Sequence, residues 1–379
     1  MRSRAEPHQL FALCENQTLH TQSNFRLLIV RLGAMGDILH ALPAVTALRL
    51  AHPDWQIGWV VEPRWQPLLS TGNRDQGTGN RKDRKSKMPV VDRLHFAPSR
   101  EWKRHPMSAN TRRAIGALRR ELRAAEYSAV LDLQGAIRSA VISRMTGCVR
   151  RIGEASPREW PAQWLFTERV VTHGAHVIEQ DVELASAVAG DALSAADAQL
   201  PIDPQAEAWC AAWLAATFPG ASRPIALITP GAGWGAKRWP PERYAAVAEG
   251  LAQRGLHVVV NAGPGEEPLA AAIASGSAVA LTATLPQLIA LTRRIALCIG
   301  GDTGPLHLAS ALSRPVVGIY GPTDPSRNGP YGTRARVLRS PDSRRDHSRR
   351  SEPDPGLLTI TPEEVLRAAD ELLAEESAR

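Results

Sequence analysis

Short apolar runs alternate with amphipathic segments along most of the chain. In the first half, apolar runs of strand length with few polar interruptions alternate with glycine-containing turns and helix-length segments. Parallel strands covered on both faces lack the strict alternation of half-exposed strands. The pattern therefore predicts a doubly wound α/β domain over residues 25–190. Its expected strands are residues 25–32, 56–62, 90–96, 127–133 and 149–152.

A second alternating series follows after residue 205. Residues 191–205 are rich in Ala, Asp and Pro, which is typical of a linker between domains. The expected strands of the second series are residues 225–229, 256–261, 278–281 and 295–299, and a helix is expected over 361–376. We predict a second Rossmann-like domain over 206–379, facing the first across a cleft. In such folds ligands bind at the carboxyl ends of the strands.

Composition agrees with two soluble domains. A length of 379 residues, 44% hydrophobic and 22% charged, suits two ordinary cores. The four cysteines are scattered without metal-ligand spacing, which favours a reducing compartment and argues against structural zinc. No apolar run has the length of a signal peptide or membrane span, so we expect a cytoplasmic protein. Residues 1–24 are expected to be a mobile extension, and residues 71–88 a polar insertion.

The net charge of +7 is compatible with nucleic acid, an anionic membrane surface or an anionic substrate. Two basic runs, residues 81–87 and 339–350, lie in loop-like stretches where charges can simply be solvated. Five arginines on a predicted helix are better placed to meet an acidic ligand: Arg112, Arg113, Arg119, Arg120 and Arg123. No nucleic-acid reader motif occurs, and aromatic residues do not interleave the basic runs, so we expect no nucleic-acid partner.

Residues 294–325 predict a strand, a tight turn at Gly300-Gly301, a short helix, a second strand and a loop bracketed by prolines. Asp302 and Thr303 are residue types that cap helices, and Pro305 suits a first helical turn. A helix that begins so abruptly favours an anion, above all a phosphate, although the stretch also fits an ordinary strand–helix junction. His307 lies on the same helical face as Thr303, and it is equally compatible with a partly buried core residue.

Three other turns carry candidate chemistry. Asp37 ends the Gly33-x-x-Gly36-Asp37 turn, where it can be a catalytic base or only a helix cap, and His40 shares its helical face. Lys237 ends a glycine-rich loop that lacks the P-loop pattern, so it is either an anion-binding cation or a surface lysine. Glu266 and Glu267 follow a strand, where an acidic residue can bind a ribose or simply start a helix.

Together these segments resemble the heptosyltransferases of glycosyltransferase family 9, most closely those of the lipopolysaccharide heptosyltransferase I type. The resemblance runs from about residue 25 to residue 331. Its motifs are Gly33-Ala-Met-Gly-Asp37-Ile-Leu-His40-Ala-Leu-Pro43, Trp59-Val-Val-Glu62, Asp132-Leu-Gln134-Gly135-x-x-Arg138-Ser139, Lys237-Arg-Trp239-Pro240, Asp302-Thr-Gly304-Pro-x-His307 and Tyr320-Gly-Pro-Thr-Asp324-Pro.

The resemblance implies a GT-B fold and inverting, metal-independent transfer of L-glycero-D-manno-heptose from ADP-heptose to a Kdo sugar of the lipopolysaccharide inner core. It implies that Asp37 is the general base and that Lys237 neutralises the departing diphosphate. The implied donor-binding residues are Asp302, Thr303, Gly304, His307, Glu266 and Gly36. The candidate acceptor-binding residues are Arg64, Arg138 and His40.

The same resemblance implies a monomer without cofactor, in peripheral contact with the cytoplasmic face of the inner membrane, where its acidic lipid-linked acceptor lies. The chain departs from the family at Leu32-Gly33-Ala34, where family members often carry hydroxyl residues that touch phosphate. Two alternatives stay open: a family member that adds a later heptose or another sugar, and an inactive nucleotide-sugar binder. The presence of both Asp37 and Lys237 argues against the second.

Overall fold

The computed structural model describes residues 24–70, 89–220, 223–274, 276–344 and 350–377. The expected N-terminal extension up to residue 23, the insertion at 71–88 with its basic run, and residues 345–349 of the second basic run lie outside the described residues.

The first half of the chain forms a six-stranded parallel sheet in the order β3-β2-β1-β4-β5-β6. Its strands are β1 (Arg26–Val30), β2 (Gln56–Val61), β3 (Arg93–Phe96), β4 (Ala129–Asp132), β5 (Arg151–Glu154) and β6 (Glu168–Val170). The central strand β1 pairs with β2 on one side and β4 on the other, with Ile29 opposite both Trp59 and Leu131. All of β1 except its first residue is buried, as its apolar sequence predicts.

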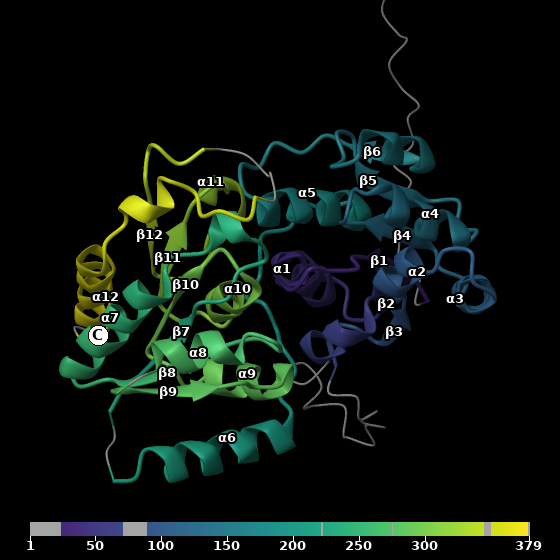
Figure 1. The fold of residues 1–379 in the computed structure, drawn as a ribbon. Coiled ribbons are helices and arrows are strands. Elements are labelled where there is room, and N and C mark those ends of the chain that lie inside the picture. The colour runs from purple at the N-terminus through teal and green to yellow at the C-terminus, as the bar shows by residue number, and fades with distance from the viewer. Residues whose placement is uncertain (1–23, 71–88, 221–222, 275, 345–349, 378–379) are drawn as a thin grey trace, which may run out of the picture.

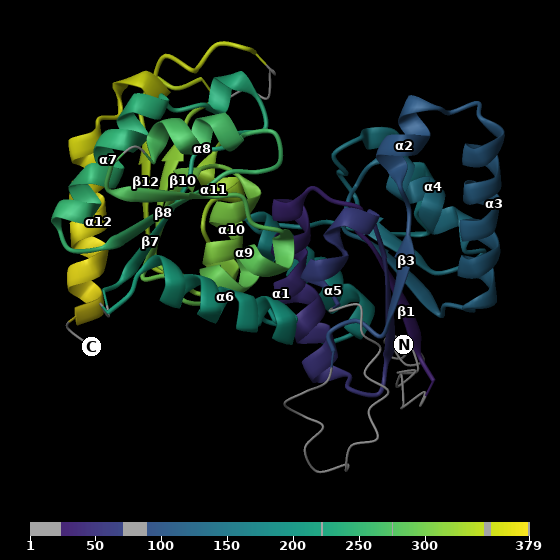
Figure 2. The same cartoon turned by 60° about the horizontal axis from the view of Figure 1, so that its bottom comes forward.

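Helices cover both faces of this sheet. The helical elements are α1 (Met35–Ala51), η1 (Pro63–Leu68), α2 (Ser99–Arg104), α3 (Ala109–Ala124), α4 (Ile137–Met145), η3 (Trp160–Leu165) and α5 (Val177–Ala189). Helices α1 and α5 lie on the face toward the second half of the molecule, whereas α3 and α4 cover the opposite face (Figures 1 and 2). We call that opposite side the outer face.

The second half repeats the architecture. Its strands are β7 (Ile225–Thr229), β8 (His257–Asn261), β9 (Ala278–Leu281), β10 (Leu297–Gly301), β11 (Val316–Tyr320) and β12 (Ala335–Arg339), in the order β12-β11-β10-β7-β8-β9. Its helical elements are α6 (Pro204–Thr217), η4 (Gly235–Lys237), α7 (Pro241–Gln253), α8 (Glu267–Ile273), α9 (Leu285–Thr292), α10 (Gly304–Ala311), α11 (Pro325–Asn328), η5 (Leu357–Thr359) and α12 (Pro362–Ser377).

The two sheets share one connectivity, because counting outward from β1 or from β7 gives the same order of strands. In each sheet the connections reverse direction at the centre, between β1 and β4 and between β7 and β10. Loops that follow these strands flank the switch point, where open α/β sheets bind ligands. In the first sheet these loops carry Asp37 and Gln134, and in the second they carry Lys237 and Asp302.

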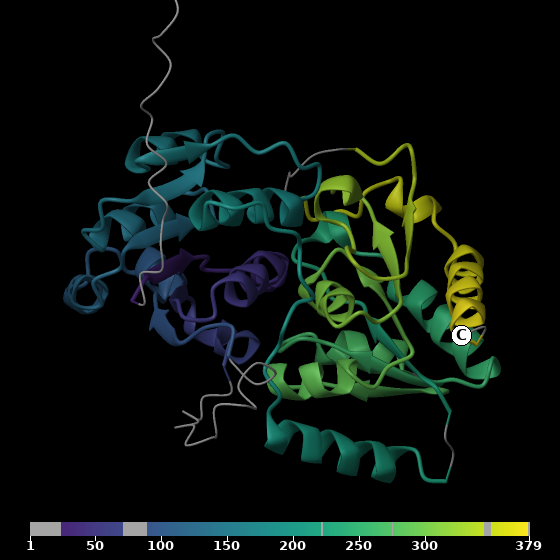
Figure 3. The same ribbon diagram turned by 180° about the vertical axis from the view of Figure 1, so that it is seen from behind.

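The halves meet along an apolar seam. Leu39 and Leu42 of α1 belong to the same buried cluster as Leu306 and Leu308 of α10. Figures 1 and 3 show the two sheets with their helices as separate halves that meet along these helices. The GT-B arrangement expected from the sequence is therefore confirmed, and the exact domain limits remain a prediction.

Several short elements escaped the sequence-based prediction, including two strands and one α-helix of the first domain and its counterpart. Strands β6 and β12 are short or polar edge strands, and α2 has only six residues. Strand β12 includes Arg339, which we expected to lie in a loop. Among the described residues, no helix is long and apolar enough to cross a membrane.

Candidate active site at the domain interface

The N-termini of α1 and α10 approach each other across the interface. A Cβ atom on Gly36 would lie 2.8 Å from Cδ2 of His307, and one on Gly304 would lie 2.6 Å from Sδ of Met35. Both glycines are therefore required by close packing between the halves. This contact brings the turn that carries Asp37 next to the turn that carries Asp302.

Asp37 lies in the first turn of α1 with a partly exposed carboxylate. Its Oδ2 accepts a hydrogen bond of 2.9 Å from the backbone N–H of Ala34, and its Oδ1 lies 3.6 Å from Nη2 of Arg31. Arg31 also donates through Nε to the carbonyl oxygen of Asp37. The carboxylate is thus oriented by its own turn, while 35% of the side chain is exposed and able to meet a ligand.

Asp181 of α5 is a functional candidate that the sequence analysis missed. Its side chain is buried, and its Oδ2 has no hydrogen-bond partner among the described residues. Burial raises the pKa of Asp181 to about 7; the charge of Arg31 opposes the rise, and the charge of Asp37 adds to it. The carboxyl groups of Asp181 and Asp37 therefore both interact electrostatically with the guanidinium of Arg31. Only the fold brings residues 31, 37 and 181 together, so no local sequence signal could have identified the group.

Asp132 is a scaffold for the loop after β4. Its Oδ1 accepts hydrogen bonds from the backbone N–H groups of Gln134 and Gly135 and from the hydroxyl of Ser139. Burial raises the pKa of Asp132 to about 6, although these hydrogen bonds oppose the rise. Gln134 in turn accepts from the N–H of Leu32 through Oε1. The motif therefore fixes the loop beside Asp37 rather than supplying a reactive group.

On the other side of the interface, Asp302 joins Lys237 and His307. Nζ of Lys237 forms an ion pair with Oδ2 of Asp302, and Nε2 of His307 lies 3.0 Å from Oδ1 of the same carboxylate. Burial disfavours the Asp302 carboxylate, but the hydrogen bond and charge of His307 and the charge of Lys237 outweigh it and hold the pKa well below the ordinary range. Asp302 is therefore ionised, and the Nε2 that faces it donates.

Helix α10 begins without a side-chain cap. Thr303 occupies the N-cap position, but its hydroxyl donates to the carbonyl of Gly301 at 3.3 Å and makes no capping hydrogen bond. Unsatisfied N–H groups and the helix dipole make such a terminus suitable for an anion. The terminus lies beside the Lys237 ammonium, since Lys237 pairs with the preceding Asp302.

His40 lies in the interface rather than on an open acceptor surface. It is buried, and its Nε2 lies 3.3 Å from Nδ1 of His307. Burial lowers the pKa of His40 well below its usual value, and the charges of His307 and His176 lower it further. His176, also missed from the sequence, caps α5 by accepting from the N–H of Ile178 and binds the carbonyl of Gly329 through Nε2. These histidines connect the two halves.

The structure separates the two adjacent glutamates. Oε2 of Glu266 accepts from the N–H of Gly263 at 3.2 Å and faces Gly231, where a Cβ atom would lie 2.4 Å away. Glu267 is exposed and binds the N–H of Gly265. Glu266 is therefore the glutamate that lies between the loops after β7 and β8.

Of the two candidate acceptor arginines, Arg64 lies beside the Asp37 turn, to which Trp65 connects it. Its Nε is 3.4 Å from Oε2 of Glu62, and its guanidinium lies over the ring of Trp65. The Trp65 ring in turn lies against Gly33, whose φ of 139° and close contact both require glycine. Arg138 is exposed on α4.

The arginines of α3 do not reach the interface. Leu118 and Leu122 anchor α3 on the outer face of the first sheet, on the side away from the second domain (Figure 2), and the α3 arginines are exposed there. The expectation that these arginines meet an acidic ligand therefore applies to the outer face and not to the site around Asp37.

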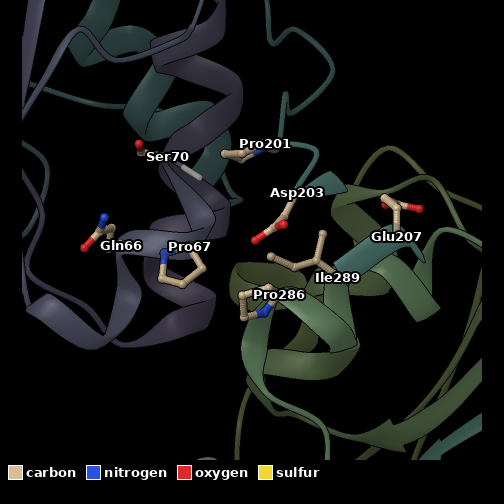
Figure 4. Close-up of a pocket in the computed structure, with 8 residues that line it drawn as sticks. All are labelled: Gln66, Pro67, Ser70, Pro201, Asp203, Glu207, Pro286 and Ile289. Carbon is tan, nitrogen blue, oxygen red and sulfur yellow. The ribbon is translucent and has the colours of Figure 1, made fainter. Parts of the chain in front are cut away.

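A small pocket lies between η1, the end of the linker and α9 (Figure 4). Its volume is about 60 Å³, too small for a nucleotide sugar, because ligand pockets are typically about 300–1,000 Å³. Its lining residues are Gln66, Pro67, Ser70, Pro201, Asp203, Glu207, Pro286 and Ile289.

Two facing Rossmann-like domains, with polar residues of both switch points at their contact, define a GT-B fold. The sequence profile described as glycosyltransferase family 9 (heptosyltransferase) matches residues 115–355. The chain belongs to this family and is a heptosyltransferase of the lipopolysaccharide core.

Individual relatives agree with this family assignment. Lipopolysaccharide heptosyltransferase 1 of Escherichia coli K12 is 28% identical, with 83% of this chain and 94% of the relative aligned. The enzyme of the same name from Pseudomonas aeruginosa is 29% identical, with 81% of each chain aligned. The solved structure of E. coli heptosyltransferase WaaC with ADP-2-deoxy-2-fluoro heptose is 26% identical and superposes with a TM-score of 0.70, covering 92% of this chain and 99% of that one.

Proposed function

We propose that this chain transfers L-glycero-D-manno-heptose from ADP-heptose to a Kdo sugar of the lipopolysaccharide inner core, with inversion and without a metal ion. The observation that carries the proposal is the contact of Gly36 with His307. It places a carboxylate of one domain opposite a cation and a helix N-terminus of the other. The similarity to heptosyltransferase 1 enzymes supports the choice of donor and acceptor.

Asp37 is the proposed general base. The acceptor hydroxyl attacks the anomeric carbon of the heptose, its proton passes to Oδ1 or Oδ2 of Asp37, and the bond from the anomeric carbon to the phosphate oxygen breaks. Attack opposite the leaving group inverts the configuration. Arg31 and the N–H of Ala34 hold the carboxylate, so little reorganisation is needed.

Lys237 and the N-terminus of α10 are proposed to receive the charge of the departing ADP. Asp302 fixes the ammonium through its carboxylate and its carbonyl oxygen, which leaves one N–H bond of Lys237 for a phosphate oxygen. Thr303, Gly304 and His307 lie at the same terminus. Glu266 is proposed to bind the ribose hydroxyls, because its carboxylate faces the loop after β7.

Arg64 and Arg138 are proposed to bind the acidic groups of the acceptor, since guanidinium groups bind carboxylates and phosphates in a bidentate manner. The acceptor is lipid-linked, so we also propose peripheral contact with the inner membrane from the cytoplasmic side.

The test is a transfer assay with ADP-heptose, a Kdo-bearing lipid acceptor and a chelator, with the product detected by mass spectrometry and its anomeric configuration by NMR. We expect a product heavier by one heptose, of inverted configuration, in equal yield with and without chelator. Absence of product from every inner-core acceptor would refute the proposal.

A second candidate is the addition of a later heptose. Lipooligosaccharide heptosyltransferase 2 of Haemophilus influenzae is 26% identical over 92% of this chain, and heptosyltransferase 3 of E. coli is 25% identical over 89%. An acceptor that already carries one heptose distinguishes the two candidates. Transfer only to that acceptor would favour the second.

A further inference from the structure

The outer face of the first domain carries an exposed aromatic and aliphatic patch. Trp160 and Trp164 of η3 are 60% and 67% exposed, and Ile137 and Val141 of α4 are 44% and 45% exposed. We call these four residues the outer patch. Helix α4 and η3 pack together through Ala140 and Ala162, which are fully buried with Phe166 beneath them.

The local packing turns the large side chains outward. Small residues fill the α4–η3 contact, whereas both indoles, 4.6 Å apart between ring centroids, remain in solvent. Ile137 and Val141 are one helical turn apart and therefore share a face of α4. Clustered exposed apolar side chains of this kind mark an interaction surface rather than a core.

Positive charge surrounds the outer patch. Arg138 and Arg144 of α4 are exposed beside it, and α3, which packs next to α4, exposes a row of arginines. That row is Arg112, Arg113, Arg119, Arg120 and Arg123. None of these seven arginines forms an ion pair with a carboxylate of the described residues. Arg123 lies over Gly147 at the end of α4, which joins the two basic helices.

The outer patch is linked by hydrogen bonds to the turn that carries the proposed base. The N–H of Ile137 donates to Oε2 of Glu159, and the N–H of Glu159 donates to the carbonyl of Gly135. The same loop holds Leu32 through Gln134. The end of the outer patch at Ile137 therefore lies at the same edge of the sheet as the turn that carries Asp37.

We infer that the outer patch and the arginines around it dock the protein on an anionic lipid bilayer. Indole rings partition into the interface between headgroups and acyl chains, while arginines bind lipid phosphates and keep their charge in water. The combination of exposed indoles with unpaired arginines favours this occupant over a second copy of the chain, which would bring like charges together. The inference extends the proposed function, because a lipid-linked acceptor must be reached from a membrane surface.

The first test measures co-sedimentation of the full chain with phosphatidylcholine vesicles, with or without phosphatidylglycerol. Because no sugar is present, the result is independent of the transfer reaction. We expect binding only to the anionic vesicles, weakened by high salt. Replacing both indoles (Trp160→Ala with Trp164→Ala) should weaken this binding about tenfold or more. Each indole buries apolar surface in the bilayer interface, and the variant lacks that contribution to binding.

Control substitutions elsewhere on the surface test whether vesicle binding depends on the outer patch and its arginines in particular. Leu50→Ala removes a side chain that is 60% exposed at the far end of α1 and should leave binding unchanged. Arg119→Glu with Arg120→Glu should weaken binding, whereas Arg367→Glu on α12 of the other domain should not. Thermal unfolding of each variant checks that the fold is kept.

The double indole variant should lose transfer to an acceptor embedded in anionic vesicles and keep its rate on an acceptor without acyl chains. Unchanged vesicle binding by this variant would overturn the inference, as would equal binding to neutral and anionic vesicles. A concentration-dependent dimer that the double substitution dissolves, with no vesicle binding, would overturn it too. Failure of transfer on every acceptor, with vesicle binding intact, would refute only the proposed function.

Discussion

The two domains share one strand order but hold their polar groups differently. In the second domain, Asp302 is 9% exposed and paired with Lys237 and His307, so the cation is fixed before a ligand arrives. In the first domain, Asp37 is 35% exposed, and its carboxylate interacts with Arg31 and with the N–H of Ala34 in its own turn. A preorganised charge suits a leaving group whose charge develops in the reaction. A more open carboxylate suits a base that must admit an acceptor.

The largest expected effect on the reaction rate comes from a substitution in the first domain. Asp37→Asn should lower kcat about 10²–10⁴-fold, because the amide cannot take the proton of the acceptor hydroxyl. The transfer rate at saturating substrate measures this effect. Asp54→Asn, which changes an exposed carboxylate of the same domain, is the control. Retained turnover would show that Asp37 only caps α1.

The corresponding change in the second domain is Lys237→Ala. It removes the cation and leaves Asp302 buried without its ion pair, so we expect kcat/KM to fall about 10²–10³-fold. Donor affinity should fall with it, in contrast to Asp37→Asn. Steady-state kinetics with varied ADP-heptose measures both, and Arg238→Ala, an exposed neighbour, is the control. Unchanged kinetics would exclude Lys237 from the site.

Asp181→Asn tests how much the buried, ionised carboxylate of Asp181 lowers the free energy of unfolding. The pKa of Asp181 is raised to about 7 in the folded protein from 3.8, so ionisation destabilises the fold as pH rises through this range. The penalty is absent below both pKa values and reaches about 4 kcal/mol above pH 7. The variant should therefore unfold at a higher temperature than the wild type at pH 8, with a smaller difference at pH 5.

Asp191→Asn, an exposed carboxylate in the linker, should shift the unfolding temperature little at either pH. An equal shift for Asp181→Asn at both pH values would contradict the raised pKa. Reduced turnover in the stabilised variant would indicate that Asp181 positions Asp37 through Arg31.

The smallest effect is expected where the domains touch. His40→Leu keeps an apolar side chain in the interface but removes the hydrogen bond to His307, worth about 1 kcal/mol, so kcat/KM should fall about fivefold. His105→Leu, an exposed histidine of the first domain, serves as the control. A loss as large as that of Lys237→Ala would mean that His40 contacts a substrate directly.

Most of the fold was predictable from the sequence because its signals are local. The strand predicted at 225–229 agrees with β7, and the helix predicted over 110–125 from the sequence agrees with α3 within a residue at each end. The glycine turn at Gly33 followed from an apolar run that stops abruptly. The turn expected at Gly300-Gly301 was wrong, because both glycines pair within β10 and the chain bends only after them. Edge strand β12 could not be found in this way, because its arginines remain half exposed on the sheet.

The site was only partly predictable. Asp37, Lys237 and Asp302 stand in recognisable turns, but their partners Arg31 and Asp181 do not. Arg31 stands between the apolar residues 27–30 and Leu32, and Asp181 lies within an ordinary amphipathic helix. Their interaction depends on the packing of α5 against α1, a contact between residues far apart in sequence. Likewise, His40 is identified as an interface residue only when α10 is placed beside α1.

The assignment of the base to the first domain and of the donor site to the second is tested most directly by calorimetry. ADP-heptose is titrated into the Asp37→Asn enzyme. Because this variant should not consume the donor, the dissociation constant can be compared with that of the wild-type protein without acceptor. The account predicts dissociation constants within about twofold of each other, since well under 0.5 kcal/mol of donor binding would involve Asp37. Tenfold weaker binding would place Asp37 among the donor ligands and contradict the assignment of base and donor site to opposite domains.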